Sequence, residues 1–546
     1  MKSTFFEFHV ATTGLFTAKA GLQVVSHNIS NATTVGYSRQ YAEQRASRPL
    51  ATYNTRGMVG TGSEVYGIGQ VRSLYLDKKY WTERGVLGEH TTKSQQLRML
   101  ETVFNELSGT GISGNFDSFF AKIQDLSTNA PDGTYRNNLV KTAESLTKFI
   151  NSTAASLRQQ QKDANTEVET VVKTINSLGA QISNLSERIS KYEIDGSQAN
   201  DLRDQRAVLI DELSLYVNVQ VEEREYDEAY AAGKYPKPED RGKSDKRLSI
   251  LINGYEFVNH WDVNLLECVP REQGKERNEM DAPGMYDLIF QNGVEFNLYS
   301  PTLKGELKGL IDVRDGNNGE KIEKSPGVYL PIHNYKGIPY YLEQLNTLVR
   351  TFAKAVNEGV DINNNSILGV KGHVEGYDKD GDKNELWLFT YKDNLGNEQQ
   401  YSGSFAPSDY DGMNCFNFQV NSKIVDDPFL LACSDTENSG ESNNNIILGF
   451  ASLATYQSLF KEGKLSDYVN AISSELAVDT KQSMNFAANY DDVTRSIDNQ
   501  RMQVSGVSLN DEVLTMVQYQ QQYTAAAKLV SVINDIYNVM INQMGM

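Results

Sequence analysis

Residues 8–29, FHVATTGLFTAKAGLQVVSHNI, carry an apolar side chain at alternating steps of three and four positions. The positions are Phe8, Ala11, Leu15, Ala18, Leu22, Val25 and Ile29. This spacing places all of these side chains along one stripe of an α-helix, as in a coiled coil. The pattern therefore predicts that the chain begins with a helix whose apolar stripe is covered by another helix.

The other end of the chain has the same character. One row of positions recurs every seven residues: Leu509, Met516, Tyr523, Val530, Tyr537 and Met544. A second, more polar row consists of Val513, Gln520, Ala527, Asn534 and Ile541. A repeat of seven keeps one stripe of a helix against a partner over its whole length.

These two end segments are also poor in charge, although exposed helices are normally rich in it. Residues 505–546 contain only Asp511, Glu512, Lys528 and Asp535 as charged side chains. One explanation is a pair of terminal helices packed on the chain's own core. We favour the other, an assembly interface in which the two ends pair and present apolar faces to neighbouring copies.

A motif follows the first stripe directly: residues 26–40 read SHNISNATTVGYSRQ. Asn28 and Asn31 suit the end of a helix, and Gly36 permits a bend into an extended segment. The stretch resembles the N-N-I-A-N-x-x-T-x-G-Y-S-R-Q signature of the flagellar axial proteins, the family of rod, hook and hook-associated proteins. The matching positions are Asn28, Asn31, Gly36, Tyr37, Ser38, Arg39 and Gln40. His27 and Ser30 depart from the signature.

Three further blocks resemble the same family and occur in the family's order. They are residues 199–214 (ANDLRDQRAVLIDELS), 305–315 (GELKGLIDVRD) and 505–512 (SGVSLNDE). Within the family, the Gly-Tyr-Ser-Arg-Gln ending is most similar to the hook-associated members at the junction of hook and filament. The similarity fades between about residues 216 and 300 and again around 385–415.

The resemblance implies a structural component of the bacterial flagellum and not an enzyme: an adaptor ring that joins hook to filament through terminal-helix packing. The implied partners are other copies of the chain, the hook protein, the second junction protein below the filament, and an export chaperone on the C-terminal helix. The implied location is outside the cell, after export through the flagellar type III apparatus without cleavage of a signal peptide. The alternatives are a hook or rod axial subunit and, in a different class, a flagellum-associated glycan hydrolase.

We expect an α+β multidomain fold: a discontinuous α-helical stem with coiled-coil-like helices at both termini and inserted β-rich domains. The predicted divisions are 1–35 (N-terminal assembly helix), 36–215 (first half of the stem), 216–304 (inserted β-rich domain), 305–375 (returning helical segment), 376–445 (second β-rich insert), 446–504 (second half of the stem) and 505–546 (C-terminal assembly helix).

The apolar spacing predicts stem helices over residues 146–192, 341–358 and about 465–500. Strands are predicted at 248–252 and 286–290, each followed by an Asn-Gly pair that favours a tight turn, and further strand at 387–391 and 416–420. Residues 222–247 are charged and contain two prolines, which predicts a solvated connector.

Composition and motifs argue against several other functions. The net charge of −19 repels phosphate backbones and anionic lipid, and no run of eighteen apolar residues occurs, so nucleic-acid binding and membrane insertion are not expected. Cys268, Cys415 and Cys433 lack the spacing of a disulfide framework or a zinc site, and the histidines never fall at ligand spacing. No nucleophile or phosphate-binding motif is present, so no cofactor is expected.

One acidic stretch invites a metal interpretation. Asp378, Asp380 and Asp382 flank Gly381, and Ca²⁺ prefers several oxygens within one tight turn. Aligning Gly381 with the glycine of a calcium loop, however, puts Gly376 and Trp387 at ligand positions where neither side chain can bind. A plain acidic turn is therefore the preferred interpretation.

Overall fold

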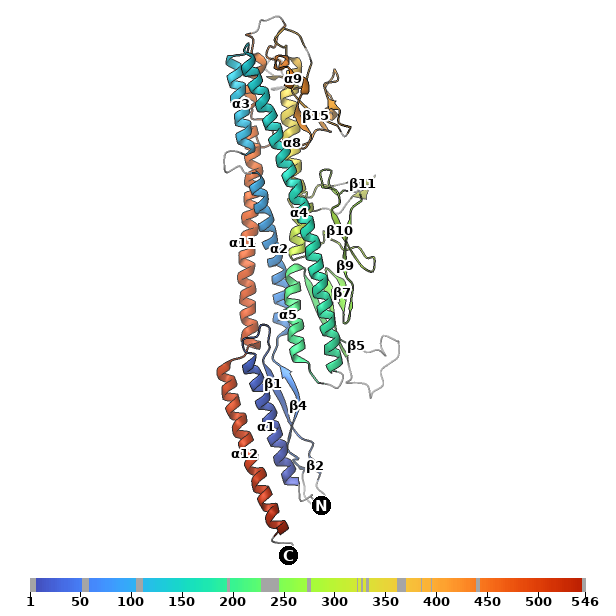
Figure 1. Cartoon of the computed structure of the whole chain (residues 1–546), viewed down its shortest axis with the longest axis vertical. Coiled ribbons are helices and arrows are strands. Elements are labelled where there is room, and N and C mark those ends of the chain that lie inside the picture. Colours follow the sequence, from blue (N-terminus) through green and yellow to red (C-terminus); the bar gives the residue numbers. More distant parts are fainter. Residues whose placement is uncertain are drawn as a thin grey trace.

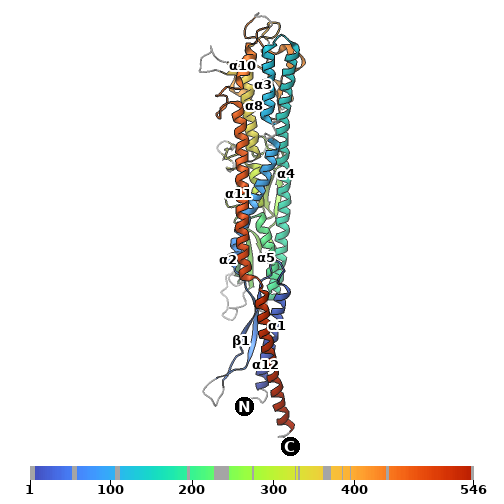
Figure 2. The ribbon, with the colours of Figure 1, turned by 90° about the vertical axis from the view of Figure 1, so that its left-hand side faces the viewer.

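The chain folds into a long, narrow rod, seen in a computed structural model (Figure 1). The structure describes residues 6–542 except 52–57, 105–110, 194–196, 227–244, 273–275, 322, 326–327, 330–332, 361–369, 384, 394 and 438–441. The two described ends of the chain lie at the same end of the rod, and the rod stays narrow when it is turned by 90° (Figure 2). The predicted α+β class with a helical stem is confirmed.

The stem is built from helices that run along the rod. Its helices are α2 (Leu74–Phe104), α3 (Ile112–Thr128), α4 (Gly133–Glu193), α5 (Asn200–Tyr216), α7 (Glu306–Asp315), α8 (Ile338–Glu358), α10 (Asn445–Leu453) and α11 (Leu465–Ser505). With 61 residues, α4 spans about 92 Å and forms the backbone of the stem. The predicted helices are confirmed, although α4 starts thirteen residues before the predicted 146.

A four-stranded antiparallel sheet, β5–β6–β7–β8, and the hairpin β9–β10 lie on one side of α4. Their bounds are β5 (Val219–Tyr226), β6 (Asp245–Ile252), β7 (Tyr255–Asn259), β8 (Asp262–Val263), β9 (Leu266–Pro270) and β10 (Tyr286–Phe290). Asn253 (φ 50°) and Gly254 (φ 83°) form the two-residue turn between β6 and β7, because both positions need the left-handed conformation. Both predicted strands with Asn-Gly turns are confirmed.

The predicted connector over 222–247 is wrong at both ends. Residues 222–226 and 245–247 belong to β5 and β6, which pair from Val219↔Ile252 to Tyr226↔Asp245. Charged side chains do not prevent strand formation where the backbone hydrogen bonds of a ladder are available and one face stays in water. The middle of the predicted connector, 227–244, lies outside the described residues.

Short strands and turns lie along the stem from its middle, where β11 is found, to the end far from the termini (Figure 1). They are β11 (Glu323–Ser325), β12 (Val328–Tyr329), β13 (Gly359–Val360), β14 (Val370–Lys371), η3 (His373–Glu375), β15 (Phe389–Lys392), β16 (Glu398–Gln399), η4 (Pro407–Tyr410), β17 (Phe418–Val420), α9 (Ser422–Asp426) and η5 (Pro428–Leu430). Strands β16–β15–β17 form one sheet, so strand is confirmed near both predicted segments, although each observed strand is shorter or shifted. The predicted domain limits themselves stay predictions.

Two apolar clusters hold the stem together. One lies at the far end, where Phe116, Phe119 and Phe352 meet edge to face; the other lies between α4, α5, α7 and the four-stranded sheet. All members of both clusters fall between residues 80 and 497.

The other end of the rod is a separate layer of structure, which we call the terminal unit. It consists of α1 (Phe6–Ser30), the strands β1 (Gln40–Ala46), β2 (Leu50–Ala51), β3 (Met58–Val59) and β4 (Ser63–Gln70), and α12 (Leu509–Asn542). Helix α1 lies between α12 and the β1–β4 ribbon (Figure 1). Residues 74–505 are called the body below.

Candidate assembly interface

Helices α1 and α12 pack against each other in antiparallel directions. Asn28 donates a hydrogen bond to Glu512 (3.1 Å), Gly21 lies against the ring of Tyr519, and Gly14 lies against Ala526. Along α1 these residues descend in steps of seven, from 28 to 14, while their partners on α12 rise in steps of seven, from 512 to 526. A Cβ added at Gly21 would lie 2.5 Å from the Tyr519 ring, so only glycine fits this close approach.

The structure places the predicted stripe of α1 on the inner side of the terminal unit. Ala11, Ala18 and Val25 are buried, and Phe8, Leu15, Leu22 and Ile29 are partly buried. The ring of Phe8 lies 6.5 Å from that of Tyr537, the next contact along the helix pair. The α1 stripe is thus covered in the single chain.

The predicted residues of α12 divide between two faces. Met516, Ala527, Val530 and Tyr537 are partly buried, whereas Leu509, Val513, Tyr523 and Ile541 are exposed. The residues of α12 that meet Asn28, Gly21 and Gly14 of α1 are Glu512, Tyr519 and Ala526, each one position before a member of the predicted row Val513, Gln520 and Ala527. Apolar spacing did not predict this row, because the close contact uses glycines on α1 and one buried carboxylate. The spacing of Gly14 and Gly21, seven residues apart, is the signal that could have found it.

A broad apolar face of α12 remains in solvent. Its exposed members include Leu514, Val517, Leu529, Val532, Ile536, Val539 and Met540. The charged residues in this half of the helix are Lys528 and Asp535. Exposed apolar side chains gathered on one helix face with so little charge are typical of a site where another protein binds.

At the C-terminal end of α1, Asn28 holds the helix to the segment of chain that follows it. Its amide donates to the carbonyl oxygen of Gln40 (2.8 Å), and its Oδ1 accepts from the Gln40 backbone N–H (2.9 Å) and from the Tyr37 hydroxyl (2.8 Å). The side chain is buried, and all these partners are satisfied within the motif of residues 26–40. The motif therefore fixes how the chain turns from α1 into β1.

Glu512 joins α12 to the same motif. Its side chain is 1% exposed, and it accepts a hydrogen bond from Nε of Arg39 at 2.6 Å. The backbone N–H of Arg39 donates to the carbonyl oxygen of Ser505 (2.8 Å), at the end of α11. One arginine thus connects α12 with the end of the body.

Asp204 on α5 anchors the motif to the body. Its carboxylate accepts from the Ser38 N–H and hydroxyl, both at 2.8 Å, and pairs with Arg72 at 3.2 Å. Burial raises the pKa of the Asp204 carboxyl, and the bonds from Ser38 and Arg72 oppose that rise. Gly36 (φ 77°) lies so close to Val208 that an added Cβ would sit 2.2 Å from its methyl group.

A second ionic chain continues from this point into the body. Arg72 pairs with Asp77 (2.7 Å), Asp77 pairs with Arg501 (2.9 Å), and Arg501 pairs with Asp211 (2.9 Å). These contacts bind α2, α5 and α11 together. None of these residues was singled out from the sequence, although Asp211, like Asp204, lies within the block 199–214.

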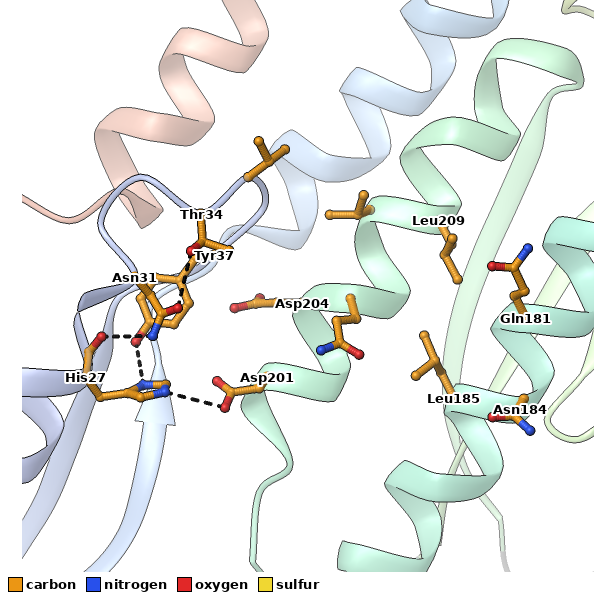
Figure 3. A pocket seen from close by; sticks show the side chains of 13 residues that line it. His27, Asn31, Thr34, Tyr37, Gln181, Asn184, Leu185, Asp201, Asp204 and Leu209 are labelled. Carbon is orange, nitrogen blue, oxygen red and sulfur yellow. Dashed lines mark hydrogen bonds and ion pairs between the residues drawn. The ribbon is translucent and has the colours of Figure 1, made fainter. Parts of the chain in front are cut away.

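A cleft of about 630 Å³ opens beside the anchored motif (Figure 3). Figure 3 shows His27 and Tyr37 on one wall, with Gln181 and Leu185 of α4 on the other and Asp201 of α5 between them. Nδ1 of His27 lies 3.0 Å from the Tyr37 hydroxyl, and burial raises the pKa of Tyr37 well above its ordinary value. The Tyr37 hydroxyl donates to Asn28, so His27 and Tyr37 belong to the hydrogen bonds that hold the motif of residues 26–40 together.

The acidic stretch at 378–382 is a turn held by its own first residue. Oδ1 of Asp378 accepts from the backbone N–H groups of Asp380 (3.0 Å) and Asp382 (2.9 Å), and Gly381 has a φ of 85°. Within the described ranges, no group of three or more potential ligands is placed to hold a metal ion. The three cysteines are free thiols.

The elongated helical body, the paired ends and the motif that links them define the class: an axial structural subunit of the bacterial flagellum. A family model described as the helical domain of flagellar hook-associated protein FlgK matches residues 97–367, about half of the chain. The chain is 26% identical to flagellar hook-associated protein 1 of Bacillus subtilis (strain 168), over 100% of this chain and 99% of that protein. It is 24% identical to the protein of the same name from Salmonella typhimurium (strain LT2), over 97% and 98%. The chain belongs to the FlgK family of flagellar hook-associated proteins.

The fold agrees with a solved structure. The flagellar hook junction protein FlgK from Burkholderia pseudomallei superposes with a TM-score of 0.52 at 13% identity, covering 77% of this chain and all of that one. These matches are all flagellar proteins, and they give the glycan-hydrolase alternative no support. Among the helices described here, none is both long and apolar enough to cross a membrane.

Proposed function

We propose that this chain is the adaptor subunit at the junction of hook and filament. Several copies form one short ring, with the terminal units as its inner tube and the bodies outside. The hook protein lies on one side of the ring and the second junction protein on the other. The relatives described above, whose names refer to the hook and its junction, support this placement.

The observation that carries the proposal is the uncovered apolar face of α12. Burying one large apolar side chain contributes roughly 1.5–3 kcal/mol, so several such side chains shared between copies stabilise a ring even after the entropic cost of association. Before assembly the same face needs protection, and an export chaperone on the C-terminal helix would supply it. Export unfolded and without cleavage through the type III apparatus completes the proposal.

The test replaces exposed side chains on this face by aspartate. Leu529→Asp and Ile536→Asp should leave the isolated subunit folded, because both side chains are in solvent, yet each would bring an unpaired charge into the assembled interface. Electron microscopy should then show hooks without filaments. Val478→Asp, at an exposed apolar position on α11 of the body, is the matched control and should leave flagella intact.

A truncation lacking residues 505–546 complements these variants. Both apolar clusters of the body lie outside the deleted segment, so the remaining chain should be folded and soluble but unable to join hook to filament. Filaments on hooks that contain either aspartate variant, or the truncated chain, would contradict the proposal. Detection of the aspartate variants in the culture medium separates a failure of assembly from a failure of export.

A further inference from the structure

The contact between terminal unit and body is polar. The members of the two apolar clusters of the body fall within residues 97–476 and 80–497, so no described residue of the terminal unit belongs to either. The chain crosses between the two parts at residues 71–73 and 506–508, and the terminal unit also touches the body through the loop 31–39 and through His27, Gln40 and Ile68. Rigid packing of an apolar core therefore stops at this boundary.

The main side-chain bonds across the boundary converge on the first turns of α5. Ser38 bonds to Asp204, Gln40 donates to Asp201 (2.7 Å), and Asn200 donates to the carbonyl oxygen of Ile68 (2.7 Å). His27 lies 3.7 Å from Asp201, a side chain that is more than half exposed. Apart from the backbone bond from Arg39 to Ser505 at the end of α11, the terminal unit is thus seated on one short stretch of α5.

Asp204 holds more of this seat than its neighbours. It accepts two hydrogen bonds from Ser38 and pairs with Arg72, which lies in the segment where the chain crosses to the body. It is buried, whereas Asp201 faces solvent. A single carboxylate therefore ties both the loop 31–39 and the crossing segment to α5.

On one side of this seat the space is open. The cleft of about 630 Å³ separates the loop 31–37 from α4, with Gln181 and Asn184 on the far wall (Figure 3). A boundary that is bonded along one line and open beside it resembles a hinge, because rotation about the line needs no change in either apolar cluster.

We propose that the terminal unit is hinged on the body, with Asp204 as the positioning residue that holds one angle and the cleft as the space into which the unit tilts. Release of the Ser38–Asp204 bonds lets the loop 31–37 approach α4. One consequence for assembly rests on the proposed function. In the proposed ring, copies that differ in the angle between terminal unit and body would let one kind of subunit fit different surroundings on the two sides of the ring.

The test measures the cleft in the isolated full-length chain. Spin labels at Lys19→Cys on α1 and Gln181→Cys on α4, in a background with Cys268→Ser, report the distance across the cleft by electron–electron double resonance. The parent protein should give one narrow distance distribution. Ser38→Ala and Asp204→Asn should each broaden it at least twofold or shift its mean, while Ser30→Ala, whose hydroxyl bonds only within α1, should leave it unchanged.

Each outcome decides the matter. A broad distribution in the parent protein, or an unchanged one in both Ser38→Ala and Asp204→Asn, would show that Asp204 holds no angle and would overturn the proposal. Ser38→Ala removes only the hydroxyl bond, since the Ser38 N–H still donates to Asp204, and should have the smaller effect. Asp204→Asn also loses part of the pairing with Arg72, so thermal unfolding of the body is followed in parallel and the distances are compared where the body of every variant is folded. Because no ring or flagellum is needed, the result is independent of whether the chain joins hook to filament.

Discussion

The glycines of α1 give the sharpest test of the helix pairing. Gly14 and Gly21 lie one heptad apart on the same face of the same helix, and both face α12. A Cβ at Gly14 would lie 3.9 Å from the Cβ of Ala526, an ordinary contact. A Cβ at Gly21 would lie 2.5 Å from the ring of Tyr519. The same substitution should therefore stabilise the helix pair at Gly14 but not at Gly21.

The magnitudes follow from the two environments. Replacing glycine by alanine inside a helix contributes about 1 kcal/mol of stability. At Gly14 nothing opposes this gain, so Gly14→Ala should stabilise the helix pair by about 1 kcal/mol. At Gly21 the added methyl group overpacks the contact, at a cost of about 1–3 kcal/mol. The Tyr519 ring must swing away and loses its 3.3 Å hydrogen bond from Gln44. The net result for Gly21→Ala lies between no change and a loss of about 2 kcal/mol.

Native-state hydrogen exchange measures the difference directly. The free energy of opening of the α1 and α12 amides should be higher in Gly14→Ala than in Gly21→Ala by about 1–3 kcal/mol, while the body amides stay unchanged in both. Equal stabilisation by the two substitutions would refute the antiparallel register with Gly21 against Tyr519. A loss in Gly14→Ala as large as in Gly21→Ala would refute it as well.

Two more predictions concern a histidine in the body and a glycine at the boundary between the body and the terminal unit. The imidazole of His373 is buried, and burial lowers its pKa to about 4, so between pH 6.5 and 4 the unfolded chain binds a proton that the folded chain does not. Stability should be complete above pH 6.5 and fall by about 3 kcal/mol towards pH 4; His373→Gln should flatten this slope in denaturant titrations, and His9→Gln on an exposed face should not. Gly36→Ala combines a positive φ with a clash against Val208 and should destabilise the terminal unit more than Gly254→Ala, which has the same backbone strain but open space, destabilises its hairpin. Proteolysis measures both effects, and equal increases in the cleavage rates of the two regions would show that the close contact does not exist.

The features that the sequence predicted correctly are those encoded by neighbours along the chain. The turn at Asn253 and Gly254 needs only local conformational preferences, and the stripe of α1 needs only helical spacing. The row of α12 that meets α1 is a different case. Glu512 is buried because Asn28 and an arginine far away in sequence satisfy it, and no local pattern marks a carboxylate for burial.

The contact between the terminal unit and the body could not be predicted for the same reason. Asp204 and Ser38 are 166 positions apart, and their contact exists only after α5 has packed beside the loop that follows α1. Both residues do lie in the blocks that resemble the axial family, and the structure brings these blocks together. Residues 26–40, 199–214 and 505–512 meet at the boundary between terminal unit and body. The resemblance thus pointed to the residues at this boundary, and only the fold shows that the three blocks lie together there.

The division of the rod into body and terminal unit bears on how assembly could be both tight and controlled. The body holds two apolar clusters of its own, so it gains little from a neighbour. In the terminal unit, one face of α12 packs against α1 and another face is exposed to solvent. Pairing with α1 already fixes the backbone of α12, so a neighbouring copy that covers the open face meets an ordered helix and gains most of the burial energy. A free α12 would first have to be ordered, and its binding would be weaker by that cost. In the proposed ring, weakening the pairing, for example by Gly21→Ala, should therefore weaken assembly even when the open face is unchanged.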